Sequence, residues 1–163
     1  MIIGLGGKKQ SGKSTIARRL SAEFRAVMRS ISAPIKLMAT QGLGIEVGKE
    51  EMTQYGVTHR KILQALGEGI WEYCGPILVL NVLQYPGNMV IDDVRRIGEA
   101  ELIKQHGGML IWVPGGEDGD DHVSETELCT RRDMFDVVLS DADPEMAVFA
   151  VDFWRRHVEQ RRD

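Results

Sequence analysis

The chain has 163 residues, a formal net charge of −4 and 43% apolar residues. One domain accommodates this length, and the ordinary balance of apolar and charged residues excludes disordered, collagen-like and coiled-coil chains. The excess of acidic residues argues against a protein whose main task is to coat nucleic acid or an anionic membrane, because both partners require excess positive charge. Two cysteines, Cys74 and Cys129, are too few for a disulfide framework, and we expect reduced thiols that fill space as small apolar groups.

Neither a membrane span nor a signal peptide is expected. No uninterrupted apolar run approaches the roughly 20 residues of a membrane helix. The N-terminus has no charged segment ahead of its short apolar stretch. The starting class is therefore a soluble cytoplasmic enzyme or binding domain.

The first half of the chain predicts two strands and several helices. Residues 1–6 form a short apolar run that ends in glycines, as a buried strand does. From Lys13 to Phe24, apolar residues recur at helical spacing. Residues 27–31 can form a second strand, which Ser32-Ala33-Pro34 stops, and residues from about 35 to 85 are expected to be helical pieces broken by glycine.

The second half predicts three strands and two helices. Residues 89–91 and 109–113 are expected to be buried strands joined by a crossover helix, and residues 135–139 are a last strand candidate. Asp143-Pro144-Glu145 supplies an N-cap, a proline at the first helical position and an early acid for a final helix. Because apolar strands alternate with helices, the sequence predicts the α/β fold class, with a mostly parallel sheet covered by helices on both faces.

The residues from Gly7 to Ser14 match the phosphate-binding loop G-x-x-x-x-G-K-[ST], between a predicted strand and a predicted helix. Glycines let the backbone point several N–H groups at one phosphate, and the helix N-terminus adds favourable potential. Lys13 can neutralise the β and γ oxygens of a nucleotide, and the Ser14 hydroxyl can ligate magnesium. An ordinary glycine-rich turn is the alternative. The residues expected to bind ATP are Gly7, Lys9, Ser11, Gly12, Lys13, Ser14 and Thr15.

Asp92 and Asp93 follow the strand 89–91, at the edge of a parallel sheet where ligands bind. One of them can hold magnesium through water, and we expect Mg²⁺ to be held by Ser14 and Asp93. The choice between the two aspartates stays open. The other interpretation is a cap for a helix that begins near Val94.

Four residues suit a second anion site: Lys36, Arg60, Gln64 and Arg95. Arginine holds a phosphate with two parallel hydrogen bonds, which orients a phosphate acceptor. Taken singly, each of the four is also typical of a solvated surface residue.

Residues from about 114 to 132 are expected to form a lid. A glycine- and acid-rich stretch, residues 115–121, is followed by His122-Val123-Ser124-Glu125, and such a segment can close over a substrate. The alternative is a surface loop that leads to a helix capped by Ser124. A calcium loop is excluded, because Cys129 occupies the position that requires a bidentate acid.

The order of these motifs resembles that of the phage-type deoxynucleoside monophosphate kinases, a branch of the P-loop nucleotide kinases. The resemblance covers most of the chain and implies a parallel sheet of about five strands, with residues from about 35 to 85 as the helical acceptor-binding part. It rests on these segments: Gly7–Thr15, Ala33–Lys36, Thr58–Gly67, Asp93–Arg95 with Glu99-Ala100, Gly107-Gly108, His122–Glu125 and Asp136.

The resemblance implies that the γ-phosphoryl group of ATP passes to a deoxynucleoside 5′-monophosphate, with Mg²⁺ as cofactor. Lys13, Arg60 and Arg95 are then the expected catalytic residues. The implied partners are ATP and a nucleoside monophosphate, with a homodimer as a further possibility and the host cytoplasm as the location of a phage protein. The residues expected to bind the acceptor are Lys36, Arg60, Gln64, Arg95 and Glu125.

A preference for deoxyribose would require an apolar wall, for which Tyr55, Trp71 and Tyr73 are candidates. The chain departs from the family pattern at Gln10, where a glycine is usual. Two alternatives stay open. One is a kinase for a ribonucleotide or another small metabolite, in which Asp92 would serve as the base for an alcohol acceptor. The other is a non-catalytic sensor that binds ATP.

Overall fold

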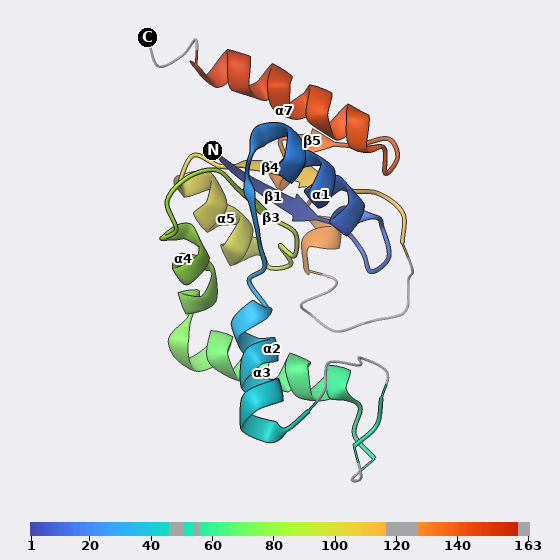
Figure 1. Cartoon of the computed structure of the whole chain (residues 1–163), viewed down its shortest axis with the longest axis vertical. Coiled ribbons are helices and arrows are strands. Elements are labelled where there is room, and N and C mark those ends of the chain that lie inside the picture. Colours follow the sequence, from blue (N-terminus) through green and yellow to red (C-terminus); the bar gives the residue numbers. More distant parts are fainter. Residues whose placement is uncertain (46–50, 54–55, 117–126, 160–163) are drawn as a thin grey trace.

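Five parallel strands form one sheet in the order β2-β3-β1-β4-β5 (Figure 1). The computed structural model describes residues 1–45, 51–53, 56–116 and 127–159. The central strands are continuously apolar because helices cover both of their faces. The strands are β1 (Ile2–Gly6), β2 (Val27–Arg29), β3 (Met89–Ile91), β4 (Met109–Trp112) and β5 (Val137–Val138).

Helices α1 (Lys13–Phe24) and α7 (Pro144–Glu159) cover one face of the sheet, where Ile16, Leu20 and Val151 are fully buried. Helices α4 (Ile77–Leu83) and α5 (Ile97–Gln105) cover the other face, together with the short helix η1 (Glu127–Thr130). A second short helix, η2 (Arg132–Met134), precedes β5. The sheet is therefore the middle layer of three, as the sequence predicts.

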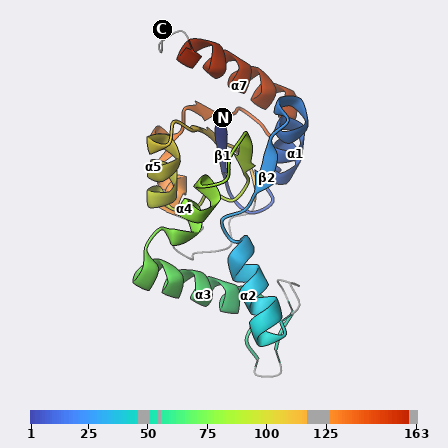
Figure 2. The same ribbon diagram turned by 60° about the vertical axis from the view of Figure 1, so that its left-hand side comes forward.

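Helices α2 (Ala33–Leu43) and α3 (His59–Cys74) pack on each other beyond the sheet, at the bottom of Figures 1 and 2. The apolar stripe of α3, which includes Leu63 and Leu66, is only half-buried. This arrangement confirms that the middle third of the chain is helical.

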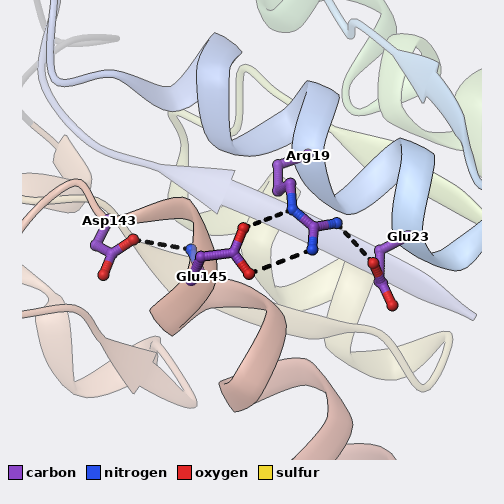
Figure 3. Close-up of polar contacts among 4 residues, drawn as sticks. All are labelled: Arg19, Glu23, Asp143 and Glu145. Carbon is purple, nitrogen blue, oxygen red and sulfur yellow. Dashed lines mark hydrogen bonds and ion pairs between the residues drawn. The ribbon is translucent and has the colours of Figure 1, made fainter.

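An ion-pair cluster joins the two helices of the first face (Figure 3). The Arg19 guanidinium of α1 donates to both carboxylate oxygens of Glu145 at 2.7 and 3.2 Å and to Glu23 at 2.6 Å. Asp143 accepts the backbone N–H of Glu145 at 2.9 Å, which confirms it as the N-cap of α7. Because exposed ion pairs contribute little, the buried apolar residues beneath supply most of the stability of this contact.

Some expected boundaries differ in the structure. The second strand ends at Arg29, and Ala33 already opens α2, with its proline in the first turn. The last strand is shorter than expected, since only Val137 and Val138 pair with β4. The expectation that both cysteines fill internal space is wrong for Cys74, which is exposed at the end of α3. In the described part of the chain, no helix is long and apolar enough to cross a membrane.

Candidate active site

The loop from Gly7 to Gly12 joins the carboxyl end of β1 to the first turn of α1, as the motif predicts. Gly7 and Gly12 have φ angles of 148° and 88°. A Cβ atom at Gly7 would lie 2.4 Å from the carbonyl oxygen of Val113. The backbone itself therefore requires glycine at both motif positions.

Lys13 is the first residue of α1, and its ammonium group lies over the loop. Nζ donates to the carbonyl oxygen of Gly7 at 2.7 Å, to the Ser11 hydroxyl at 3.2 Å and to the carbonyl oxygen of Lys8. Helix α1 has no side-chain cap and no acidic residue in its first turn. Together the helix end and the lysine provide N–H groups and positive charge where a polyphosphate would lie.

Gln10 lies at the tip of the same loop with a φ angle of 61°. This left-handed conformation is easy for glycine and costs about 1 kcal/mol or more for a residue with a Cβ atom. Gln10, where the chain departs from the family pattern, thus has a backbone conformation that favours glycine.

The Asp93 carboxylate is hydrogen-bonded to the segment that connects β2 to α2. It accepts hydrogen bonds from the hydroxyl groups of Ser30 and Ser32, both at 2.7 Å, and from the backbone N–H groups of Ile31 and Ser32 at 2.7 and 3.0 Å. Asp93 therefore fastens the start of α2 to the end of β3. The interpretation of the aspartate pair as a cap for a helix near Val94 is wrong, because α5 begins only at Ile97.

Asp92 is half-buried at the same edge of the sheet. Burial raises the pKa of its carboxyl group, the charge of Asp93 adds to this rise, and the charges of Lys36 and Lys13 oppose it. Asp92 therefore lies within electrostatic reach of both the phosphate loop and α2. Of the two aspartates, Asp92 is the one whose pKa is influenced by the charge of Lys13 in the phosphate loop.

A pocket of about 110 Å³ opens between α2, α3 and the turn from β3 to α5. Trp71 and Leu78 are among the apolar residues that complete its wall. The structure thus brings together, from three separate parts of the chain, all four residues that were expected at a second anion site: Lys36, Arg60, Gln64 and Arg95.

Three charged residues of this pocket were not expected from the sequence: Glu68, Arg96 and Glu99. The Arg96 guanidinium pairs with the Glu68 carboxylate and lies 5.0 Å from the centroid of the Trp71 ring. The Glu99 carboxylate accepts the backbone N–H groups of Arg95 at 2.8 Å and Arg96 at 3.1 Å. Arg96 is the N-cap of α5 and Glu99 is its third residue, so the glutamate occupies the position that it has in a capping box. The sequence does not signal this motif, because its N-cap is an arginine and not a serine or threonine.

One wall candidate lies away from the pocket, and other expected residues are outside the described part of the chain. Tyr73 is 83% exposed and lies outside the pocket lining, so the expectation that it forms an apolar wall is wrong for this residue. Tyr55, Glu125 and residues 117–126 of the expected lid lie outside the described residues. Trp71 is the wall candidate that the structure places at the pocket.

No protein-family model matches the chain. A protein of Acanthamoeba polyphaga mimivirus with the name "Putative deoxynucleotide monophosphate kinase" is 32% identical over 169 residues, which cover 85% of this chain and 87% of the viral protein. The chain belongs to the deoxynucleotide monophosphate kinase family. This finding confirms the resemblance that the order of the motifs indicates.

Solved structures of P-loop kinases share the fold of this family member. Shikimate kinase from Aquifex aeolicus vf5 has a TM-score of 0.56 at 14% identity, over 94% of this chain and 95% of that chain. Shikimate kinase from Acinetobacter baumannii, in complex with shikimate, has a TM-score of 0.51 at 11% identity, over 98% and 93%. At these identities the likeness establishes the fold alone. The predicted α/β fold with a five-stranded parallel sheet is confirmed. The similarity to the viral relative, together with this fold, identifies the chain as a P-loop kinase.

Proposed function

We propose that this kinase transfers the γ-phosphoryl group of ATP to the 5′-phosphate of a deoxynucleoside monophosphate. The observation that carries the proposal is the meeting of Lys36, Arg60 and Arg95 in one pocket at the same edge of the sheet as the phosphate loop. A phosphate donor and a phosphate acceptor both need positive charge, and this chain has a separate group of cations for each. The name of the mimivirus relative supports the choice of acceptor.

The reaction would proceed by attack of an acceptor phosphate oxygen on the γ-phosphorus of ATP. A new P–O bond forms to the acceptor, the bond between the γ-phosphorus and the β–γ bridging oxygen breaks, and ADP leaves with that oxygen. The attacking oxygen is already largely ionised at neutral pH, because the second pKa of a phosphate monoester is about 6. The protein therefore needs no general base, and its task is to align two anions and neutralise their charge.

In this proposal Lys13 stabilises the transferred phosphoryl group, and the loop residues from Gly7 to Thr15 hold the donor. Arg60 and Arg95 bind the acceptor phosphate, and Lys36 supports them from α2. The segment from 35 to 85, which includes α3, α4 and most of α2, is thus the acceptor-binding part of the chain in this proposal.

Magnesium fits the residues at the loop. The described residues hold no cluster of three or more side chains of the types His, Cys, Asp and Glu that would form a metal cage. Mg²⁺ bound to ATP needs only one or two protein oxygens, since phosphates and water supply the rest. Ser14 and Asp92 would hold it, because the Asp93 carboxylate already accepts four hydrogen bonds. When bound, the ion would neutralise phosphate charge.

The proposal also includes a preference for deoxyribose over ribose. The candidate for the apolar wall is Trp71, which lines the pocket beside Gly98. A Cβ atom at Gly98 would lie 3.0 Å from the Trp71 ring, so the indole packs directly on the first turn of α5. Exclusion of one hydroxyl group by such a wall supplies about a hundredfold selectivity.

The test is release of ADP from ATP and Mg²⁺ with each deoxynucleoside and ribonucleoside monophosphate in turn, and without acceptor as the control. We expect ADP and a deoxynucleoside diphosphate in equal amounts with at least one deoxynucleotide. Binding of ATP without turnover on any acceptor would instead favour a non-catalytic sensor. Equal kcat/KM for ribose and deoxyribose forms would remove the sugar preference and leave the kinase assignment intact.

A further inference from the structure

Glu99 is a buried carboxyl group at the wall of the acceptor pocket. The residue is only 7% exposed, and it belongs to the lining of the pocket. One oxygen, Oε2, accepts the backbone N–H groups of both Arg95 and Arg96. The carboxylate therefore holds the turn from which two pocket guanidinium groups extend.

Charged groups from four elements line the same pocket as Glu99 or lie near the start of its helix. On its own segment these are Asp93, Arg95 and Arg96. Helix α2 contributes Lys36, and α3 contributes Arg60 and Glu68 at the same pocket. Glu127 of η1 accepts the N–H of Ile97 at 3.2 Å, near the start of α5.

Burial is the main influence on this carboxyl group. It raises the pKa of Glu99 to about 7, and Asp93 adds to the rise, whereas the two backbone N–H groups and the charge of Arg96 lower it. Glu99 therefore exchanges its proton near neutral pH, in a pocket that must receive an anion.

We propose that Glu99 is a positioning residue of the acceptor pocket and that it takes up a proton when the acceptor phosphate binds. The inference rests on the proposed function. A phosphate dianion bound by the cations of this pocket brings two negative charges close to Glu99. Their repulsion of the carboxylate favours the neutral acid, so proton uptake relieves it.

The sign of the pH dependence follows. Below pH 7 most of the free protein already carries the proton, and binding exchanges none. Above pH 7 the free carboxylate is ionised, so the acceptor must bind together with a proton, and its affinity falls as the pH rises. If acceptor binding raises the pKa of Glu99 by one further unit, the dissociation constant of the acceptor rises about fivefold between pH 7 and 9.

The first experiment is titration calorimetry on the unsubstituted protein at pH 7.5, in two buffers of different ionisation enthalpy. The titrant is the deoxynucleoside monophosphate that supports turnover, which is almost entirely a dianion at this pH. We expect net uptake of a fraction of one proton per acceptor bound, and none attributable to Glu99 when ADP is the titrant. Binding without uptake, or with release, overturns the proposal. No binding by any monophosphate would instead contradict the proposed function.

The second experiment compares Glu99→Gln with Glu101→Gln, an exposed glutamate of the same helix. We expect KM for the acceptor to rise between pH 7 and 9 in the unsubstituted protein and in Glu101→Gln. In Glu99→Gln it should stay constant within about twofold, since an amide has no proton to exchange. Parallel pH profiles of all three proteins would show that Glu99 serves packing alone. Should Glu99→Gln fail to fold, the proton count of the unsubstituted protein still decides.

Discussion

The phosphate loop and the acceptor pocket both bind anions in our proposal, and they are built in opposite ways. The loop is one continuous segment whose backbone geometry does most of the binding, with Lys13 as its charged side chain. The pocket is assembled from side chains on α2, α3 and the turn after β3, which lie far apart in the sequence. The comparison teaches that a backbone site depends on glycine and local conformation, whereas a side-chain site depends on the packing that brings its residues together.

The largest expected effect comes from the charge of the loop. Lys13→Ala should lower kcat by a hundredfold to a thousandfold, or about 3–4 kcal/mol, because an electrostatic contact to the transferred group is lost. Circular dichroism should show an unchanged fold, since this half-buried side chain donates hydrogen bonds to the loop and does not belong to the apolar core. Turnover at the unsubstituted rate would contradict the proposed mechanism.

The pocket arginines sharpen the separation of the two sites. Arg60→Ala or Arg95→Ala should lower kcat/KM for the monophosphate by the equivalent of roughly 1.5–3 kcal/mol, as a charge-assisted contact disappears. The dissociation constant of ATP, measured without acceptor, should change little. Lysine at either position should restore activity only in part, because an ammonium group lacks the planar fork. If both alanine variants weaken the binding of ATP and leave kcat/KM for the acceptor unchanged, the two arginines belong to the ATP site and our assignment is reversed.

The two neighbouring aspartates should separate stability from activity. Asp93→Asn removes a charged acceptor of four hydrogen bonds, so the free energy of unfolding should fall by about 2 kcal/mol. Asp92→Asn should leave the thermal midpoint nearly unchanged or raise it, because burial destabilises the ionised form of this half-buried carboxyl group. It should instead raise the Mg²⁺ concentration needed for half-maximal activity. The opposite pattern would return the metal to Asp93.

The smallest expected effect tests the backbone of the loop. Gln10→Gly should raise the free energy of unfolding by about 0.5–1 kcal/mol, since glycine adopts a φ angle of 61° without strain. The matched control is Gln41→Gly in the exposed part of α2, where glycine should lower stability by about 1 kcal/mol. Chemical denaturation measures both. A loss of stability in Gln10→Gly would show that the residue makes contacts that outweigh its backbone conformation.

The sequence alone determined the elements whose causes are local. The glycine and lysine pattern located the phosphate loop, apolar runs located β1, β3 and β4, and Asp143-Pro144 located the start of α7. Each of these elements depends on residues only a few positions apart. Few other local conformations would bury the same apolar groups or suit the same glycine and proline residues.

Only the tertiary structure decided which charged side chains share a pocket and what each carboxylate does. The sequence offered Asp92 and Asp93 as equivalent neighbours. In the folded chain Asp93 binds the start of α2, whereas Asp92 lies within electrostatic reach of Lys13. The sequence likewise did not show that Glu99 is buried at the wall of the acceptor pocket, because α2 and α3, which form much of that wall, come from elsewhere in the chain. The role of a charged residue depends on its distance from other charges and from water, and those distances exist only after the chain has folded.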